Sequence, residues 1–324
     1  MHYLVIGGAG YIGSHMVALL LEQGHRVTVV DDLSNGHRDA VLGGELIVRD
    51  FSDRAFLDGL FSGQRFDGVF HFASRILVGE SVGQPGKYYR DNTFATLTLL
   101  EAMRDHGIDR LVFSSTAAVY GEPDYVPIDE QHSCKPVNPY GASKLMVETM
   151  LGDFRRAHGL NYVALRYFNA AGADAKGRLG ERHEPETHLV PLAIRAALGK
   201  MPPLKLFGDD YDTPDGTCIR DYIHVEDLCD AHLLAMQYMQ DGGEPMAFNL
   251  GNGAGYSVRQ VMDAVAAVGG REVPFVTAPR RPGDPARLVA DATRARTMLG
   301  WQPRYADLED IIRHAWQWEC RQGE

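Results

Sequence analysis

The sequence predicts an α/β fold, in which a doubly wound parallel sheet of the Rossmann type carries a smaller, interleaved C-terminal lobe. Short apolar runs rich in β-branched residues alternate with longer segments of helical period, and a glycine-rich turn joins the first run to the first helical segment. The clearest later runs are 27–30, 46–48, 68–72 and 111–113. Because each run is apolar throughout, we expect helices to cover every strand on both faces.

The composition of the chain changes at about residue 170. Two stretches rich in Gly, Pro and Asp, GADAKGRLGERHEPETH and FGDDYDTPDGT, predict an irregular second lobe. A helical stretch and the strand-like AFNLGNG that follows it favour a return to the first lobe. We therefore predict a dinucleotide-binding domain of residues 1–169 and 221–250, and a substrate-binding lobe of residues 170–220 and 251–324.

Composition excludes several classes of function. The net charge of −11 argues against a nucleic-acid partner, which requires a basic surface. No signal-peptide pattern is found at the start, and the apolar runs are far shorter than the roughly 18 residues that span a bilayer. The four cysteines form no CxxC pair, which is typical of free thiols in a reducing compartment. We expect a cytoplasmic protein with no membrane partner.

The stretch GGAGYIGSH predicts a dinucleotide site. Gly7, Gly10 and Gly13 allow a tight turn and a close approach of backbone to a pyrophosphate at a helix N-terminus. The second strand ends in Asp31 and Asp32, 18 and 19 residues past Gly13, where a carboxylate can bind the adenosine ribose. Asp31 would repel a 2′-phosphate, so the pattern favours NAD over NADP. A plain strand-to-helix turn is the alternative.

Three residues form a candidate catalytic set. Tyr140 and Lys144, in NPYGASKLMVE, are four residues apart and share one helix face. Thr116, in FSSTAAVYG, follows a strand at the carboxyl edge of the sheet, where open α/β sheets bind ligands. A solvated helix face and a capping threonine are the alternatives.

Eight stretches of this chain resemble the extended short-chain dehydrogenase/reductases and, within them, the family of UDP-glucose 4-epimerases. They are GGAGYIGSH, VVDDLSNG, HFASRILVGES, SSTAAVYG, NPYGASKLMVE, LRYFNAAGAD, GTCIRDYIHVEDL and APRRPGDPARLVAD. The resemblance implies a tightly held NAD and UDP-glucose and UDP-galactose as substrates. It also implies a homodimer joined through helices at 88–103 and 140–154.

The resemblance further implies a role for each matching residue. Catalysis, which the resemblance implies is the oxidation of a sugar alcohol, falls to Thr116, Tyr140 and Lys144. Oxidation of an alcohol needs a base, and we expect Lys144 and a positive nicotinamide to lower the pKa of Tyr140 from about 10 toward neutrality. The cofactor-binding positions are Gly7, Gly10, Tyr11, Ile12, Gly13, Asp31, Asp32, Asn35, Asp50, Phe51, Phe72, Ala73, Asn92, Tyr140, Lys144 and Tyr167. The substrate-binding positions are Thr116, Tyr140, Asn169, His188, Leu189, Lys205, Phe207, Arg220, Arg281, Asp284 and Leu288. Leu288 matches the position beside the sugar 2-substituent.

Two departures from the pattern of the family concern contacts to cofactor and sugar. Several members have a lysine where Ile76 stands, so that a charged contact to the cofactor is missing or comes from Arg75. His188 stands where some members have asparagine, which leaves the hydrogen bond to the sugar undecided. The stretch RHEPETH lacks the HExxH spacing, and Pro185 disrupts the helix that such a site needs, so we predict no metal site.

Other interpretations stay open. A nucleotide-sugar 4,6-dehydratase needs an acid and a base, typically Asp-Glu, directly after the threonine, where this chain has Ala117 and Ala118. A uronic-acid epimerase or decarboxylase needs a cation for the C6 carboxylate, which the sequence does not locate. A regulator that senses NAD without catalysis would have no reason to keep the catalytic set. At single positions, Arg220 could simply pair with Asp221, and Phe207 could be a core aromatic.

Overall fold

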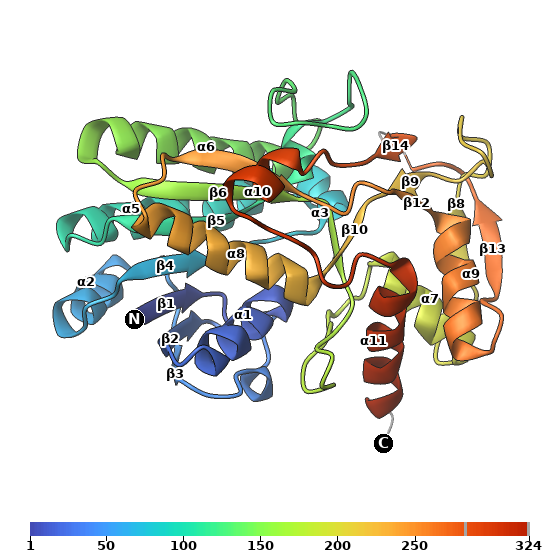
Figure 1. Cartoon of the computed structure of the whole chain (residues 1–324), viewed down its shortest axis with the longest axis horizontal. Helices are drawn as coiled ribbons and strands as arrows, with labels where there is room; N and C mark the ends of the chain where they lie inside the picture. The colour runs from blue at the N-terminus through green and yellow to red at the C-terminus, as the bar shows by residue number, and fades with distance from the viewer. Residues whose placement is uncertain (282–283, 323–324) are drawn as a thin grey trace.

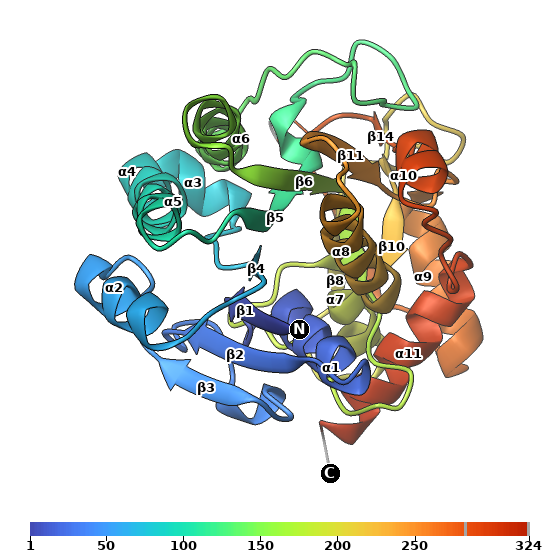
Figure 2. The same cartoon turned by 60° about the vertical axis from the view of Figure 1, so that its left-hand side comes forward.

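The computed structural model describes residues 1–281 and 284–322. Within them, a seven-stranded parallel sheet has the order β11-β6-β5-β4-β1-β2-β3 (Figures 1 and 2). Its strands are β1 (His2–Ile6), β2 (Arg26–Asp31), β3 (Glu45–Val48), β4 (Gly68–His71), β5 (Arg110–Thr116), β6 (Asn161–Tyr167) and β11 (Met246–Leu250). Strand order reverses between β1 and β4, which confirms the predicted doubly wound sheet.

Helices cover both faces of this sheet, as Figure 2 shows. One face carries α1 (Tyr11–Glu22) and α8 (Val225–Gln240), and the other carries α2 (Arg54–Gly63), α5 (Ala95–Asp105) and α6 (Pro139–His158). Strand β1 shows the cause, since successive side chains point to opposite faces. Tyr3 and Val5 join the core with α1 and α8, whereas Leu4 and Ile6 join the core with the other three helices.

Strand β3 does not fit the prediction that every strand is covered on both faces. It forms the edge of the sheet, and Val48 is 38% exposed. The apolar run was correct as a strand but wrong as a buried one, because sequence alone does not say which strand lies at an edge.

Helix α6 begins and ends at recognisable signals. The Asn138 side chain accepts a hydrogen bond of 2.9 Å from the Gly141 amide, and Pro139 occupies the first turn. Gly159 ends the helix in the left-handed conformation. Shorter elements precede α5 and α6. They are η1 (Arg38–Ala40), α3 (Val78–Gly83), α4 (Pro85–Tyr88), the π-helical η2 (Tyr89–Phe94) and η3 (Ala117–Val119).

A second core lies beyond the carboxyl edge of the sheet, on the right in Figure 1. Three helices build it: α7 (Leu189–Ala197), α9 (Val258–Gly269) and α11 (Leu308–Arg321). Small sheets lie outside the main sheet: β7 (Asn169–Ala171) pairs with β10 (Tyr222–His224), β8 (Leu204–Phe207) pairs with β13 (Phe275–Ala278), and β9 (Ile219–Arg220) lies between β12 (Tyr256–Ser257) and β14 (Arg287–Leu288).

The division into two domains stays a prediction, and its last residue, 324, lies outside the described residues. Strand β11 and helix α8 belong to the main sheet and its cover. Helix α10 (Thr293–Met298), however, contributes Ala295 to that same core, together with Trp301 that follows it. The predicted second lobe therefore packs in part against the first.

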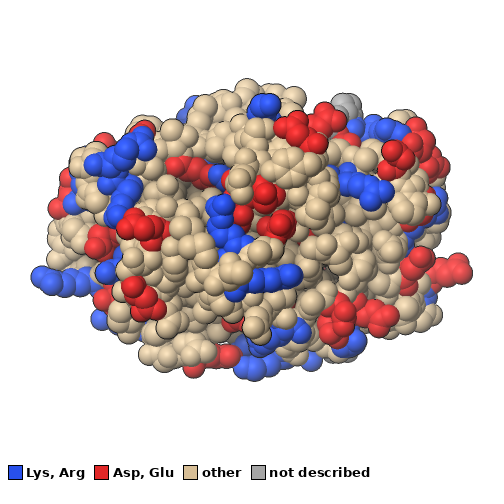
Figure 3. Space-filling model, turned by 45° about the horizontal axis from the view of Figure 1, so that its top comes forward, with Lys and Arg blue, Asp and Glu red and all other residues tan. Residues whose placement is uncertain are grey.

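Charged side chains are distributed over the surface in both signs. Basic and acidic residues are interspersed on the face drawn in Figure 3. No helix among the described residues is long and apolar enough to cross a membrane.

Candidate active site

The glycine-rich turn between β1 and α1 packs closely against other backbone segments, and side chains at two of its glycines would collide with them. A Cβ on Gly7, whose φ is +80°, would lie 2.4 Å from the Ala73 amide nitrogen, and one on Gly13 would lie 2.1 Å from the Gly7 carbonyl oxygen. At Gly10, which caps α1, the nearest atom to such a Cβ lies 3.5 Å away. The first-turn amides, including that of Ile12, have no intrahelical acceptor. The turn therefore fits a pyrophosphate.

The end of β2 supplies two carboxylates with different surroundings. Asp31 accepts hydrogen bonds from the amides of Ala9 (2.9 Å) and Leu33 (2.8 Å), so it also fixes the glycine-rich turn, and burial raises its pKa. Asp32 is exposed and accepts from the Ser34 amide at 2.8 Å. Asn35 follows them in the same loop. The two carboxylates lie where the sequence places the adenosine ribose.

The remaining predicted cofactor positions lie after the next strands. The amides of Phe72 and Ala73 donate to the Ile6 carbonyl oxygen at 2.8 and 3.1 Å, which closes the switch point between β4 and β1. Buried Asn92, in the π-helical η2, bonds the backbone of Arg75 in both directions. Asp50, exposed, and Phe51, half-buried against His71, follow β3.

Ile76, at the position where several family members have a lysine, supplies no positive charge to the predicted cofactor site. Ile76 is 37% exposed. Its neighbour Arg75 pairs through Nε with Asp91 at 2.9 Å, so its guanidinium is already engaged by a carboxylate.

The three candidate catalytic residues converge from β5 and α6. Thr116 ends β5, and its hydroxyl accepts a hydrogen bond of 3.1 Å from the Ala118 amide. Lys144 is buried, and its Nζ donates to the Ser114 carbonyl oxygen at 2.8 Å. Burial lowers the pKa of Lys144 to about 7. The sheet edge and the helix together hold an amine, a hydroxyl and a phenol around one position.

The pKa of Tyr140 differs from the expectation. Burial raises it, and the hydroxyl of Thr116 acts in the opposite direction. Burial also lowers the pKa of Lys144, so this amine is only partly charged near neutral pH. The protein's own groups therefore do not produce the expected lowering of the Tyr140 pKa, and a contribution from the positive nicotinamide stays a prediction.

A buried ion pair supports this set, and the sequence argument missed it. Glu148 lies one turn after Lys144, accepts from the Ser115 hydroxyl at 2.5 Å and pairs with Arg166, whose Nε lies 3.0 Å from the Glu148 carboxylate. Arg166 also donates to the Tyr120 hydroxyl at 3.0 Å. The pair joins α6 to the ends of β5 and β6, next to Thr116 and Tyr167. Only the four-residue spacing from Lys144 could have indicated it.

His232 of α8 is a second residue that sequence reasoning missed. Its Nδ1 lies 2.8 Å from the Leu228 carbonyl oxygen and its Nε2 lies 3.0 Å from the Ser114 hydroxyl. Its ring packs 4.8 Å from the ring of Phe72 and 6.3 Å from that of Tyr167. This buried imidazole thus packs against two of the predicted cofactor-binding residues, Phe72 and Tyr167.

The predicted substrate residues come from the small sheets. Arg220 of β9 pairs with Asp284, so the alternative pairing with Asp221 is wrong. Asp221 instead accepts backbone amides, including that of Ala290 at 3.0 Å. Arg281 stacks on the Phe207 ring, 4.1 Å from its centroid. The other two predicted positions on these strands are Asn169, which donates to the Asp221 carbonyl oxygen, and exposed Lys205 on β8.

Leu288 of β14 stands opposite Arg220 in the strand register and is partly buried. It packs against a small cluster that includes Ala117 and Tyr120. Leu288 therefore lies near both Arg220 and the residue that follows Thr116, and its place beside the sugar 2-substituent stays a prediction.

His188 and Leu189 begin α7 beside Asn169, and these three residues line one small cavity. His188 Nδ1 lies 2.7 Å from Glu181 and 3.0 Å from Glu186. The two carboxylates raise the pKa of His188 to about 10. They hold the imidazole at the wall of the predicted sugar pocket, although asparagine occupies this position in some members of the family.

Comparison with known proteins decides the family. The model of the NAD dependent epimerase/dehydratase family matches residues 3–251. The chain belongs to the NAD dependent epimerase/dehydratase family. A UDP-glucose 4-epimerase of Halalkalibacterium halodurans is 51% identical over 318 residues, which cover 98% of this chain and 95% of the relative. A UDP-glucose 4-epimerase of Azospirillum brasilense is 53% identical over 98% of this chain and 91% of the relative.

Solved structures agree with this assignment. UDP-glucose 4-epimerase from Brucella ovis in complex with NAD has a TM-score of 0.95 and 48% identity, over 97% of each chain. The UDP-Glc/GlcNAc 4-epimerase from Campylobacter jejuni has a TM-score of 0.87 and 43% identity, over 99% of each chain. The epimerase/dehydratase family thus includes members of similar fold and different sugar range.

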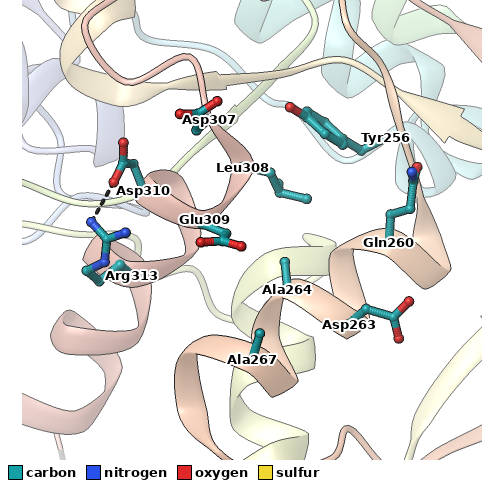
Figure 4. A pocket seen from close by; sticks show the side chains of 10 residues that line it. All are labelled: Tyr256, Gln260, Asp263, Ala264, Ala267, Asp307, Leu308, Glu309, Asp310 and Arg313. Atoms are coloured by element: carbon teal, nitrogen blue, oxygen red, sulfur yellow. Dashed lines mark hydrogen bonds and ion pairs between the residues drawn. The ribbon is translucent and has the colours of Figure 1, made fainter.

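A separate open pocket of about 630 Å³ lies between α9 and α11 (Figure 4). Its lining includes four carboxylates, Asp263, Asp307, Glu309 and Asp310, and one cation, Arg313, which pairs with Asp310. None of the predicted site residues lines it. Four carboxylates with one paired arginine make this wall unfavourable for an anionic nucleotide sugar.

Proposed function

We propose that this protein interconverts UDP-glucose and UDP-galactose by inverting the configuration at C4 of the sugar, with NAD retained as its cofactor. The convergence of Thr116, Tyr140 and Lys144 at the carboxyl edge of the sheet carries the proposal. Ala117 and Ala118, which follow Thr116, offer no acid or base for loss of water, so the arrangement favours epimerisation over 4,6-dehydration. The names of the similar proteins support the same substrates.

In this mechanism Tyr140 is the base that removes the proton from the sugar 4-hydroxyl. Thr116 orients that proton, and Lys144 holds the phenol in place and stabilises its ionised form. When bound, NAD supplies reversible hydride transfer at C4, through a 4-keto sugar that is reduced on its opposite face. Asp31, Asp32 and the glycine-rich turn would hold its adenosine ribose and pyrophosphate.

Retention of the cofactor is the first expected result. Because each epimerisation regenerates NAD, we expect purified protein to convert UDP-galactose to UDP-glucose with no added cofactor, and heat to release NAD from it. Chromatography of the supernatant and of the sugar nucleotides measures both. Activity that depends strictly on added NAD, together with a supernatant free of dinucleotide, would contradict a retained cofactor.

Sugar range is the second expected result, and it rests on Leu288. Leucine there fills space that an acetamido group would need, and overpacking of this kind costs about 1 to 3 kcal/mol, or roughly 5- to 150-fold in kcat/KM. We therefore expect UDP-galactose to be preferred over UDP-N-acetylgalactosamine by such a factor, and Leu288→Ser to narrow the difference.

The control for this experiment is Leu42→Ser, the same substitution at a leucine that is 45% exposed. It should leave the ratio of the two kcat/KM values unchanged. Comparable values in the wild type, or no relative gain for the acetylated sugar in Leu288→Ser, would remove Leu288 as the gate.

We also propose that the protein forms a homodimer and works in the cytoplasm. Apolar side chains stay exposed near the helices that would form the dimer: Val82 of α3 is 66% exposed, Phe94 of η2 60% and Met146 of α6 45%. Single exposed residues are ordinary, but three of them on adjoining elements favour an interface. The free cysteines suit a reducing compartment. Light scattering of the purified protein measures the oligomeric state.

A further inference from the structure

The loop between β7 and α7 brings together four side chains that can bind a metal. Glu181, His183, Glu186 and His188 each offer one ligand atom, and these atoms all lie within 4.8 Å of one another. No helix forms over residues 181–188, as expected from Pro185, and the HExxH spacing is absent. The loop itself nevertheless brings Glu181 and Glu186 next to the two imidazoles.

We propose that Glu181, His183, Glu186 and His188 bind one divalent transition-metal ion of the zinc type. The set has two imidazole nitrogens and two carboxylates, which are ligands that Zn²⁺ accepts at about 2.0 to 2.2 Å. Tetrahedral ligands at that distance lie about 3.3 Å apart. This inference concerns a site beyond the proposed reaction and does not depend on the identity of the sugar.

The separations between imidazole and carboxylate atoms lie on both sides of that value. Nδ1 of His183 lies 3.0 Å from Glu181 Oε1 and 3.9 Å from Glu186 Oε2. Nδ1 of His188 lies 2.7 Å from Glu181 Oε1 and 3.0 Å from Glu186 Oε1. Because one ligand atom of each residue lies within 4.8 Å of the others, the widest pair has to close by at most about 1.5 Å around a central ion.

Glu186 supplies an independent observation. Its side chain is 3% exposed, and its Oε2 is buried without a hydrogen-bond partner. Its Oε1 already accepts the amides of Thr187 and His188 at 2.8 and 2.9 Å. A buried carboxylate oxygen without a partner is costly, and an ion among these four ligands would satisfy it.

The charge balance of the cluster also favours a cation. The side chain of Glu181 is 6% exposed, and the ion pairs that the described residues give Glu181 and Glu186 are with His183 and His188. The charge of Arg195 interacts with both carboxylates at longer range, but its guanidinium forms an ion pair with Glu319, at 2.8 Å. The cluster keeps negative charge unless both imidazoles are protonated, and a divalent ion that displaces the proton from each ligating nitrogen would neutralise the two buried carboxylates.

The loop is held in place from outside the cluster, so the ligands are preorganised. Arg182 pairs with Asp39 through two hydrogen bonds of 2.9 and 2.8 Å, and the Trp318 indole donates to the Glu181 carbonyl oxygen at 3.3 Å. With four protein ligands the site is closed, as in structural zinc sites, and leaves no position for an activated water. The ion would fix His188 at the wall of the cavity that also contains Asn169 and Leu189.

Zinc binding by the full-length protein tests the proposal. The exposed thiol of Cys320 is itself a zinc ligand, so the experiment uses a Cys320→Ser background. After chelator treatment and dialysis, we expect calorimetry to give one Zn²⁺ per chain and far weaker binding of Mg²⁺, which prefers six oxygen ligands. Glu186→Gln and His183→Asn should each bind Zn²⁺ at least tenfold more weakly, and zinc should raise the Tm of the parent protein but not of these variants.

The matched control is His158→Gln, which removes an exposed imidazole at the end of α6 and should leave zinc affinity unchanged. X-ray absorption at the zinc edge, measured on the parent protein, should show nitrogen and oxygen ligands, so the test survives a variant that fails to fold. No uptake by the parent, equal affinity in Glu186→Gln, or an edge spectrum of sulfur ligands alone would overturn the site. Turnover of UDP-galactose, assayed in parallel, tests the proposed function separately.

Discussion

Tyr140→Phe should cut the turnover of UDP-galactose by about 10²- to 10⁴-fold, which is the usual contribution of a positioned general base. The substitution removes one oxygen from a buried side chain and leaves the ring that α6 packs. Lys144 keeps its hydrogen bond to the Ser114 carbonyl oxygen, so the binding site for the cofactor should survive. The measurement is kcat on purified protein, with the NAD content determined after heating.

A surface tyrosine provides the control for that result. The Tyr125 side chain is 47% exposed, and its hydroxyl donates to Asp129 at 2.7 Å. Tyr125→Phe removes the same oxygen and should leave kcat unchanged. Near-normal turnover in Tyr140→Phe, with NAD still bound, would exclude Tyr140 as the base.

The elements of the main sheet were predictable because their signals are local. The four predicted runs lie within or next to β2, β3, β4 and β5, and the helical segment predicted after the glycine-rich turn is α1. Buried parallel strands read as continuous apolar runs, and helices as a 3.6-residue repeat. The doubly wound arrangement of the sheet was also predictable, since parallel strands joined by helices leave few topologies.

The second lobe was not predictable in detail because its pairings are distant. Leu204 of β8 pairs with Phe275 of β13, and Ile219 of β9 pairs with Arg287 of β14. Strands of two to four residues carry too little periodicity to be recognised, and nothing local says which distant segment completes them. The packing of Ala295 and Trp301 in the core of the main sheet could not be predicted, for the same reason.

Residues of the candidate site also differ in whether a local signal in the sequence identifies them. Residues that act through backbone shape or helix spacing, such as Gly13, Tyr140 and Lys144, could be found from spacing alone. Glu148 and Arg166 could not, because their ion pair joins a helix to a strand 18 residues away and its partners depend on the fold. The pairing of Glu181 with His188 could not be predicted either, because it depends on the path of a loop.

Loss of the Arg220 side chain should weaken UDP-sugar binding far more than NAD binding. Arg220 is held between Asp284 and the Ile219 carbonyl oxygen, and its side chain is only 12% exposed. A guanidinium fixed in this way is preorganised for a diphosphate, and charge-assisted hydrogen bonds contribute about 1.5 to 3 kcal/mol each. We therefore expect Arg220→Ala to raise the Kd for UDP by roughly 10- to 150-fold. Arg281→Ala should act in the same direction.

Arg280 offers a control at the neighbouring position. It is a surface arginine, with 45% of its side chain exposed, and it pairs with Asp210, whose side chain is 72% exposed. Arg280→Ala removes an equal charge next to Arg281 but should leave the Kd for UDP within about twofold, because exposed ion pairs contribute little. Calorimetry with UDP, and the NAD content of each variant, separate the two ligands. Equal losses of UDP binding and NAD binding in Arg220→Ala would mean that this arginine supports the fold. An effect of Arg280→Ala as large as that of Arg281→Ala would mean that the arginines attract UDP by their charge alone and make no specific contact with its diphosphate.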